Sequence, residues 1–177
     1  MLDRIVAIDV ETTGSSPEGG DKIIEIAAVE MIDLQITGNA LHQYINPNFT
    51  ISDTVSSDTG ITAGFLETQP HFSGVASNLV KFIAGSPLLS SNTSFDMRFL
   101  NHELSGLGLD NLAQHGSIDL LKLSRKHFPG EPASLDYHVG KCDIKTEEID
   151  AQGAIKDAII TALVFKTCFS EIRNAER

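Results

Sequence analysis

Residues 4–14 read RIVAIDVETTG, an apolar and β-branched run that leads directly into two carboxylates. The run predicts a buried strand. Side chains alternate along a strand, so Asp9 and Glu11 are expected on the same face. Two like charges at the end of a buried strand repel each other and lose hydration unless a positive group neutralises them. Such oxygen ligands suit Mg²⁺ or Mn²⁺, and the simpler alternative is an exposed strand end that carries two acids by chance.

Length and composition are typical of one globular domain. The chain has 177 residues, of which 41% are hydrophobic, so residues 1–177 are expected to form a single domain with a core of ordinary size. Neither a membrane-span pattern nor a signal-peptide pattern is present, which predicts a cytoplasmic protein without a membrane partner. Cys142 and Cys168 lie far apart in the sequence and lack metal-ligand spacing, so no disulfide or zinc site is expected.

The formal net charge is −11, whereas nucleic-acid-binding proteins usually carry a basic face. This charge argues against long phosphate contacts along a duplex. It is compatible with a small site at which metal ions supply the positive charge.

The remaining pattern predicts an α/β domain with a mixed sheet. Three successive strands with short links suggest an antiparallel meander. After the first strand, the expected elements are strands at 22–31 and 41–45, a polar loop at 46–60, short helical material at 61–68, a helix at 74–85, a strand at 87–90, and helices at 94–105, 117–126, 134–141 and 153–172.

Two further acids follow predicted elements. Asp96 comes shortly after the strand at 87–90, and Asp157 lies among apolar residues of the last helix. Taken singly, each has an ordinary explanation as a surface acid or as an acid that favours a helix N-terminus.

Taken together, these segments resemble the three motifs of the DEDD 3′–5′ exonucleases. Residues 9–14 (DVETTG) are similar to the first motif, residues 92–96 (NTSFD) to the second and residues 153–158 (GAIKDA) to the third. The resemblance extends over nearly the whole chain. Within the family it is closest to the proofreading epsilon subunits of bacterial replicative DNA polymerases and their stand-alone relatives, on the DEDDh branch.

The resemblance implies a ribonuclease-H-like fold, in which three antiparallel strands and then parallel strands form a five-stranded mixed sheet flanked by helices. It implies that the four acids hold two divalent cations, Mg²⁺ or Mn²⁺, at the scissile phosphate. It also implies that the substrate is bound by Thr12, Thr13 and Gly14 in the first motif and by Asn92 and Phe95 in the second.

One departure from the family pattern concerns the general base. The DEDDh branch has histidine five residues before the last aspartate, where this chain has Gln152. Glutamine can hydrogen-bond a water but cannot take its proton, and general-base catalysis typically contributes about 10²–10⁴-fold. The spacing also places Gln152 in the loop before the last helix, because residues five apart do not share a helical face. His138 would be a replacement base if its helix faced the site, and the alternative is a packed or surface histidine.

Two functions remain open at this stage. The expected one is a metal-dependent 3′–5′ exonuclease that acts on single-stranded DNA or RNA 3′ ends, with weakened activity, and a polymerase subunit is a possible partner. The alternative is an inactive relative that binds nucleic-acid ends or a protein partner. A third explanation is that glutamine was introduced at position 152 to trap a substrate complex.

Overall fold

The apolar run that opens the sequence forms the central strand of the sheet. In the computed structural model, which describes residues 4–169, this strand is β1 (Arg4–Thr12). It pairs antiparallel with β2 on one side and parallel with β4 on the other, so its side chains from Ile5 to Ile8 are at most 1% exposed. The five strands have the order β3-β2-β1-β4-β5, which confirms the predicted mixed sheet. The other strands are β2 (Ile23–Ile32), β3 (Gln35–Tyr44), β4 (Leu88–Ser90) and β5 (Ser117–Asp119).

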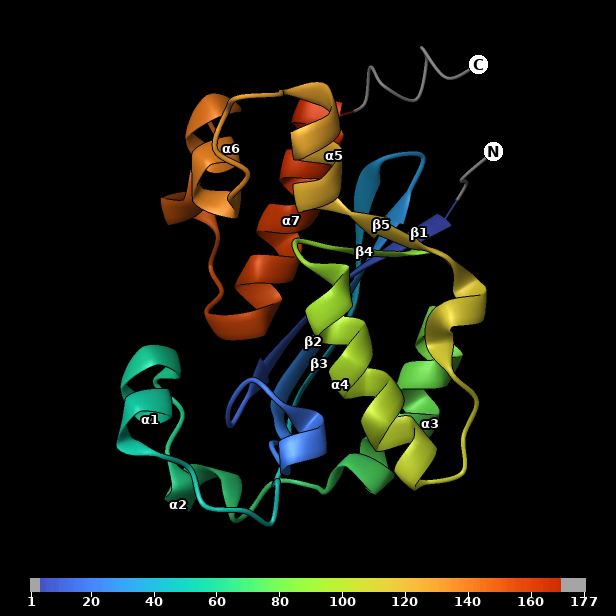
Figure 1. Cartoon of the computed structure of the whole chain (residues 1–177), viewed down its shortest axis with the longest axis vertical. Coiled ribbons are helices and arrows are strands. Elements are labelled where there is room, and N and C mark those ends of the chain that lie inside the picture. Colours follow the sequence, from blue (N-terminus) through green and yellow to red (C-terminus); the bar gives the residue numbers. More distant parts are fainter. Residues whose placement is uncertain (1–3, 170–177) are drawn as a thin grey trace.

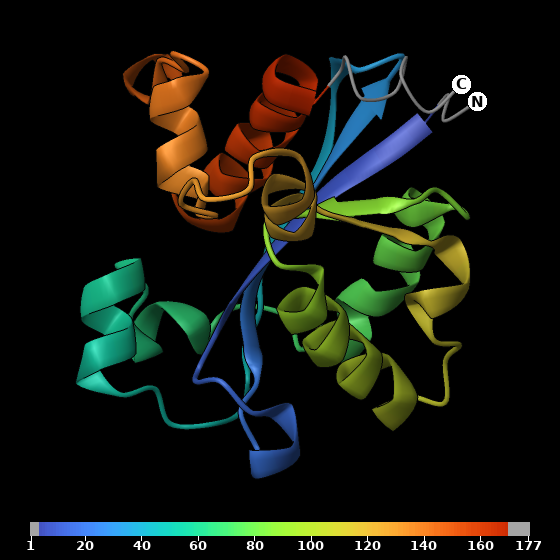
Figure 2. The same cartoon turned by 45° about the horizontal axis from the view of Figure 1, so that its top comes forward.

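Helices cover both faces of this sheet, with α3 and α4 on one side and α7 on the other (Figures 1 and 2). No helix in the range 4–169 is long and apolar enough to cross a membrane. The helices are α1 (Asp53–Thr59), α2 (Ala63–Leu66), α3 (Phe72–Ile83), α4 (Thr93–Gly106), α5 (Leu120–His127), α6 (Leu135–Lys141) and α7 (Gly153–Phe169), and 3-10 turns lie at Pro17–Gly19, Leu112–His115 and Thr146–Glu148.

The alternation of β1 determines what each helix covers. Val6 and Ile8 belong to the core that contains α3 and α4, whereas Ile5 and Ala7 belong to the core that contains α7. Odd-numbered residues of β1 therefore face α7. The acids of β1 are also odd-numbered, so the sheet directs them toward the same helix.

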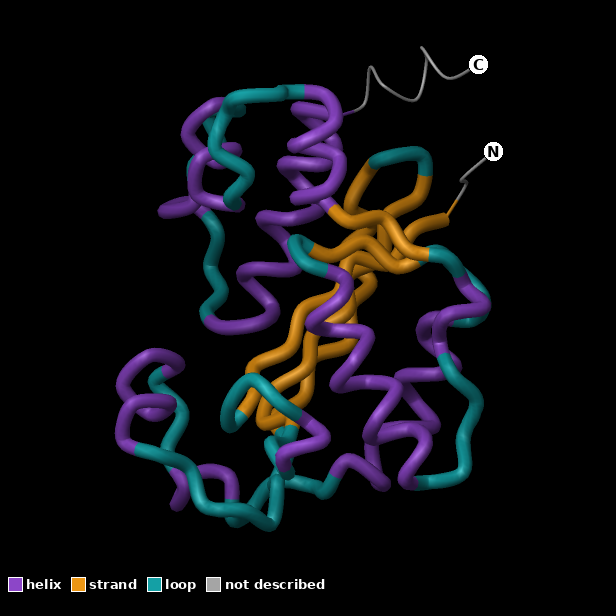
Figure 3. The backbone as a smooth tube through the Cα atoms, in the orientation of Figure 1, coloured by secondary structure: helices purple, strands orange, loops and turns teal. Residues whose placement is uncertain are grey.

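The segment after β3 is more ordered than predicted. Residues 46–60 were expected to be a loop, but they contain α1, whose N-terminus is capped by the Ser52 side chain, which accepts a hydrogen bond from the Val55 N–H. None of the residues of α1 is buried, so the helix lacks the apolar stripe by which helices are recognised in a sequence. Figure 3 shows α1 and α2 near the end of the sheet where β3 leads into this segment.

Two other elements differ clearly from the prediction. Residues 117–126 were expected to form one helix, but the first three form β5, too short for a detectable period. The third strand begins at Gln35 and not at 41, because Asp33 and Leu34 adopt positive φ angles of 49° and 64° and close a tight hairpin. The last helix begins as predicted at Gly153 and is described to Phe169. Its predicted end at 170–172 lies outside the described residues.

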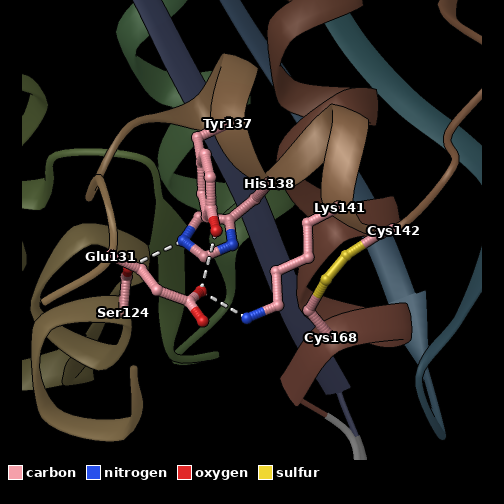
Figure 4. Close-up of a disulfide and its surroundings, with 7 residues drawn as sticks. All are labelled: Ser124, Glu131, Tyr137, His138, Lys141, Cys142 and Cys168. Atoms are coloured by element: carbon pink, nitrogen blue, oxygen red, sulfur yellow. Dashed lines mark hydrogen bonds and ion pairs between the residues drawn. A yellow bond between two sulfur atoms is a disulfide. The ribbon is translucent and has the colours of Figure 1, made fainter. Parts of the chain in front are cut away.

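The prediction of no disulfide was wrong. Cys142, at the end of α6, is bonded to Cys168 in α7, with their Cα atoms 6.1 Å apart (Figure 4). The two helices pack together, and this proximity depends on the tertiary fold and not on the 26-residue separation in the sequence. Next to the disulfide, Lys141 and Tyr137 both donate hydrogen bonds to Glu131.

We predict that reducing this disulfide lowers stability. A cross-link that closes a loop of this length restricts the unfolded chain and typically adds about 3 kcal/mol, which corresponds to a fall in Tm of roughly 6–12 °C for a domain of this size. The measurement is thermal unfolding with and without a reductant. The Cys142→Ser/Cys168→Ser double variant is the control and should not respond to the reductant. An unchanged Tm after reduction of the parent protein would contradict the prediction.

Candidate active site

Three carboxylates from two distant segments meet between the end of β1 and the first turns of α7. Asp9 and Glu11 extend from the end of β1, and Asp157 lies one turn into α7. One oxygen from each lies within 4.8 Å of the others, and all three side chains are half-buried. The sheet alternation directs the first two to the α7 face, and the start of α7 at Gly153 brings the third to the same place.

Asp96 is located beside this group but is not part of it. It lies in the first turn of α4 and is 3% exposed. Its carboxylate accepts a hydrogen bond from the Val10 N–H at 3.2 Å and another from the Ser90 hydroxyl. Val10 separates the two acids of β1, so Asp96 is fixed against the same strand end.

Burial and nearby carboxylates raise the pKa values of all four acids. Burial is the largest cause in each case, followed by neighbouring carboxylates for Asp9 and Glu11. The pKa of Glu11 rises to about 7, and burial raises the pKa of Asp96 to about 6, although its hydrogen bonds oppose this. The pKa of Asp157 is raised by burial and then by Asp136. Without a cation these groups keep their protons to a higher pH than ordinary carboxyl groups do, and an all-carboxylate donor set is what Mg²⁺ or Mn²⁺ accepts.

The loop after β1 is held by its own hydrogen bonds. The Thr12 hydroxyl donates to the Gly14 carbonyl at 2.6 Å. The Thr13 hydroxyl accepts from the Lys22 N–H at 2.9 Å, and the Thr13 N–H donates to the Lys22 carbonyl at 2.9 Å. The Asp21 carboxylate packs directly against the Cα atom of Gly14, where any side chain would overlap with it. A side chain at position 14 would therefore displace the Asp21 carboxylate, which accepts a hydrogen bond from the Ser16 N–H.

Asn92 and Phe95 flank the first turn of α4. Asn92 is exposed at the N-cap position, and its backbone N–H donates to the Ser90 hydroxyl at 3.0 Å. The half-buried ring of Phe95 packs against Phe99 at a centroid distance of 5.0 Å. Both residues lie within four positions of Asp96 and on the same turn.

Gln152 lies in the loop immediately before α7, as its spacing from Asp157 predicted. Its side chain is exposed. It lines a cavity of about 200 Å³ together with Glu25, Tyr44 and Phe65. The backbone changes direction at the next residue, Gly153, which has a φ of +60°.

His138 does not face the acids. Its ring is fully buried, its Nε2 lies 2.7 Å from the Ser124 hydroxyl, and burial lowers its pKa. It packs against Phe128 and Phe169 (Figure 4 shows its place beside the disulfide). Phe169 lies about 18 Å along α7 from Asp157 at 1.5 Å per residue. The structure therefore supports the packed-histidine alternative and not the replacement base.

Two acids next to the site were not singled out from the sequence. One is Asp21, described above, which lies in a turn rich in polar residues. The other is Glu25, which is 1% exposed near the start of β2 and contributes to the raised pKa values of Asp9 and Glu11. A signal for Glu25 was present, because it is a single acid within the apolar run Ile23–Val29, and buried acids are rare without a partner.

Comparisons with known proteins agree with this arrangement. A family model of RNase_T exonucleases matches residues 6–165. The chain is 39% identical over 165 residues to the DNA polymerase III subunit epsilon of Rickettsia typhi, covering 92% of this chain and 72% of that protein. It is 34% identical over 171 residues to the subunit of the same name from Escherichia coli, covering 93% and 70% respectively.

Solved structures show the same fold. Exonuclease X in complex with 5′ overhanging duplex DNA superposes with a TM-score of 0.70 at 25% identity, covering 97% of this chain and 91% of that one. The nuclease domain of 3′hExo, a DEDDh family member bound to rAMP, superposes with a TM-score of 0.78 at 23% identity, covering 96% and 93%. The chain therefore belongs to the RNase_T family of 3′–5′ exonucleases.

Proposed function

We propose that this protein removes nucleotides from the 3′ ends of single-stranded DNA, or of RNA, in a reaction that depends on two divalent cations. The observation that carries the proposal is the convergence of Asp9, Glu11 and Asp157, whose ligand atoms lie within 4.8 Å of one another. Partly buried carboxylates with raised pKa values, gathered at one place, have no evident benefit to the fold alone. We propose that residues 1–177 act as one exonuclease domain.

In this proposal Asp9, Glu11, Asp96 and Asp157 hold the cations, Mg²⁺ or Mn²⁺. Once bound, the cations would stabilise the attacking and leaving oxygens during in-line displacement at the scissile phosphate. The buried Asp96, held by the Val10 N–H and the Ser90 hydroxyl, would supply its charge from a fixed position. Such preorganisation avoids reorganisation during the reaction.

The substrate end would lie against backbone and aromatic groups around the acids. The hydrogen bonds from Thr12 to Gly14 and from the Lys22 N–H to Thr13 fix that loop, so its backbone can approach the terminal nucleotide. Asn92 and Phe95 would form the other side of the pocket. An exposed amide and a half-buried ring provide hydrogen bonding and stacking, which single-stranded nucleic acids require.

Gln152 is the proposed weak point of catalysis. It occupies the position of the family's general base, from which its amide can hydrogen-bond and orient a water but cannot accept its proton. The same observation favours a second function, in which the domain binds nucleic-acid ends, or a polymerase subunit as a protein partner, without cleaving. The epsilon-type relatives are named as DNA polymerase III subunits, and this supports a polymerase partner and a cytoplasmic location.

We predict that metal binding raises thermal stability. A ligand that binds only the folded state stabilises it by mass action, by about 2.7 kcal/mol at 100 times its Kd. The measurement is the Tm with millimolar Mg²⁺ or Mn²⁺ against EDTA. Asp157→Asn should reduce the shift, and Asp110→Asn, which changes an exposed aspartate outside the site, should leave it intact. A parent protein whose Tm ignores both metals would argue against the site.

We also predict that the metal-free protein loses stability as the pH rises from about 4.5 to 7. Glu11 and Asp96 have folded pKa values of about 7 and about 6, above their ordinary values of 4.5 and 3.8. Between these limits the folded state binds more protons than the unfolded state, so the free energy of unfolding falls with rising pH. Urea unfolding in EDTA at several pH values measures this slope. Glu11→Gln should flatten it, and an equal slope in that variant would count against the explanation.

The decisive experiment is degradation of a 3′-labelled single strand, for both DNA and RNA, with and without divalent metal. We expect slow, metal-dependent release of nucleotides from the parent protein that increases with pH, because the chain itself supplies no base at position 152. Gln152→His should raise the rate by about 10²-fold or more. Asp9→Asn is the inactive control. If Gln152→His leaves the rate unchanged while the acids bind metal, the non-catalytic function is the better one.

A further inference from the structure

Glu25 is a buried carboxylate with only half of its hydrogen-bonding capacity used. Its Oε1 accepts a hydrogen bond from Nε2 of His42 at 2.7 Å. Its Oε2 is buried and has no hydrogen-bond partner. A polar atom left in this state is costly, by about 1–3 kcal/mol, and each such case calls for a physical explanation.

The sheet places this carboxylate next to the candidate metal ligands. Glu25 is directly opposite Glu11 on β1 and opposite Tyr44 on β3. Residues opposite each other in antiparallel strands share a face, so Glu25 faces α7 as Glu11 does. His42 lies on the same face, in the row that contains Asp9 and Ala27.

The unpartnered oxygen lies against the first residue of α7. A Cβ atom on Gly153 would overlap with the carboxylate of Glu25, and the φ of +60° there also disfavours a side chain. The first N–H groups of a helix have no partners within the helix and carry partial positive charge. A negative charge is therefore well placed at this helix start, which explains how the buried oxygen is tolerated.

The start of α7 controls two residues of the candidate site. Gln152 immediately precedes Gly153, and Asp157 lies four residues after it, on the same helical face. The surface of α7 that contacts Glu25 is thus the one that presents Asp157. Gln152, Gly153 and Glu25 also line one cavity of about 200 Å³.

We propose that Glu25, oriented by His42, is a positioning residue that fixes the start of α7, and with it residue 152, relative to the metal ligands. The inference rests on the proposed function only in assigning the metal ligands and the general-base position. Glu25 itself need not touch the substrate or a cation. Its effect passes through Gly153, because the Glu25 carboxylate lies directly against the backbone of that glycine.

The test compares Glu25→Gln with a matched control, Glu30→Gln. Glu30 lies on the same strand and bridges its neighbours in a similar way, because it accepts hydrogen bonds from Arg4 and Thr37. Glutamine keeps the shape of each side chain and removes its charge. Each substitution is made in the parent chain and together with Gln152→His.

The first readout is the gain in kcat that Gln152→His produces in each background, in a double-mutant cycle. With Glu25 intact we expect about 10²-fold, and with Glu25→Gln the gain should shrink by about tenfold, since coupled residues typically interact by this amount. Glu30→Gln should leave the gain unchanged. Equal gains in all three backgrounds would overturn the proposal, because a merely structural role lowers activity without altering the gain.

The second readout does not depend on activity. Helix geometry bonds the Asp157 N–H to the Gly153 carbonyl, so hydrogen exchange at the Asp157 amide reports how firmly α7 begins. We expect exchange to accelerate with Glu25→Gln and not with Glu30→Gln, and unchanged exchange in both would overturn the proposal. If Gln152→His never raises activity in any background, the proposed catalysis fails, while exchange still decides whether Glu25 positions the helix.

A further variant covers the case in which Glu25→Gln does not fold. His42→Ala removes the orienting hydrogen bond from a side chain that is 32% exposed on an edge strand, where substitution is better tolerated. It should show the same loss of coupling to Gln152→His and the same faster exchange at Asp157. A folded His42→Ala variant with parental values for both would overturn the proposal.

Discussion

The repulsion between carboxylates gathered at one end of β1 is the constraint on which the rest of this structure depends. Asp9 and Glu11 are placed together by strand alternation, and burial and their neighbours raise the pKa values of both. Asp96 is held in place by backbone and hydroxyl donors, and Asp157 is brought in by α7. Each surrounding element thus supplies an acid or restrains one. A fold without a use for cations would gain by replacing these acids, since buried like charges oppose its stability.

The sequence was informative where local pattern and tertiary environment agree. The apolar run before Asp9 predicted the central strand, and Gly153 marked the start of the last helix. The sequence was uninformative where contacts between distant segments decide whether an element forms. The β5 strand has only three residues and exists because β4 lies beside it. The α1 helix has a capped N-terminus, one apolar residue (Val55) and no buried residue. The disulfide depends on how α6 meets α7, which the spacing of two cysteines does not reveal.

In the candidate site, too, some residues could be predicted from the sequence and others depend on tertiary contacts. The acids could be named from the sequence because their motifs lie in order along the chain. The part played by Glu25 could not, because it depends on the register that sets β2 opposite Glu11 and on the close approach of Gly153. His138 illustrates the reverse case. Its place on a predicted helix left open whether it faced the site, and only the packing against Phe169 decides that it does not.

At Gln152, the contacts that determine the fold are separate from the side chain that would take part in the chemistry. The position of residue 152 is set by the positive φ of Gly153 and by the Glu25 carboxylate that lies against Gly153. Neither depends on the side chain of residue 152. The identity of the side chain at 152 contributes nothing to those contacts, because it is exposed and faces a cavity. A histidine can therefore be exchanged for a glutamine there at little cost in stability, while the proton-accepting group is lost. The scaffold keeps the acids and the start of α7 in place whichever side chain occupies position 152.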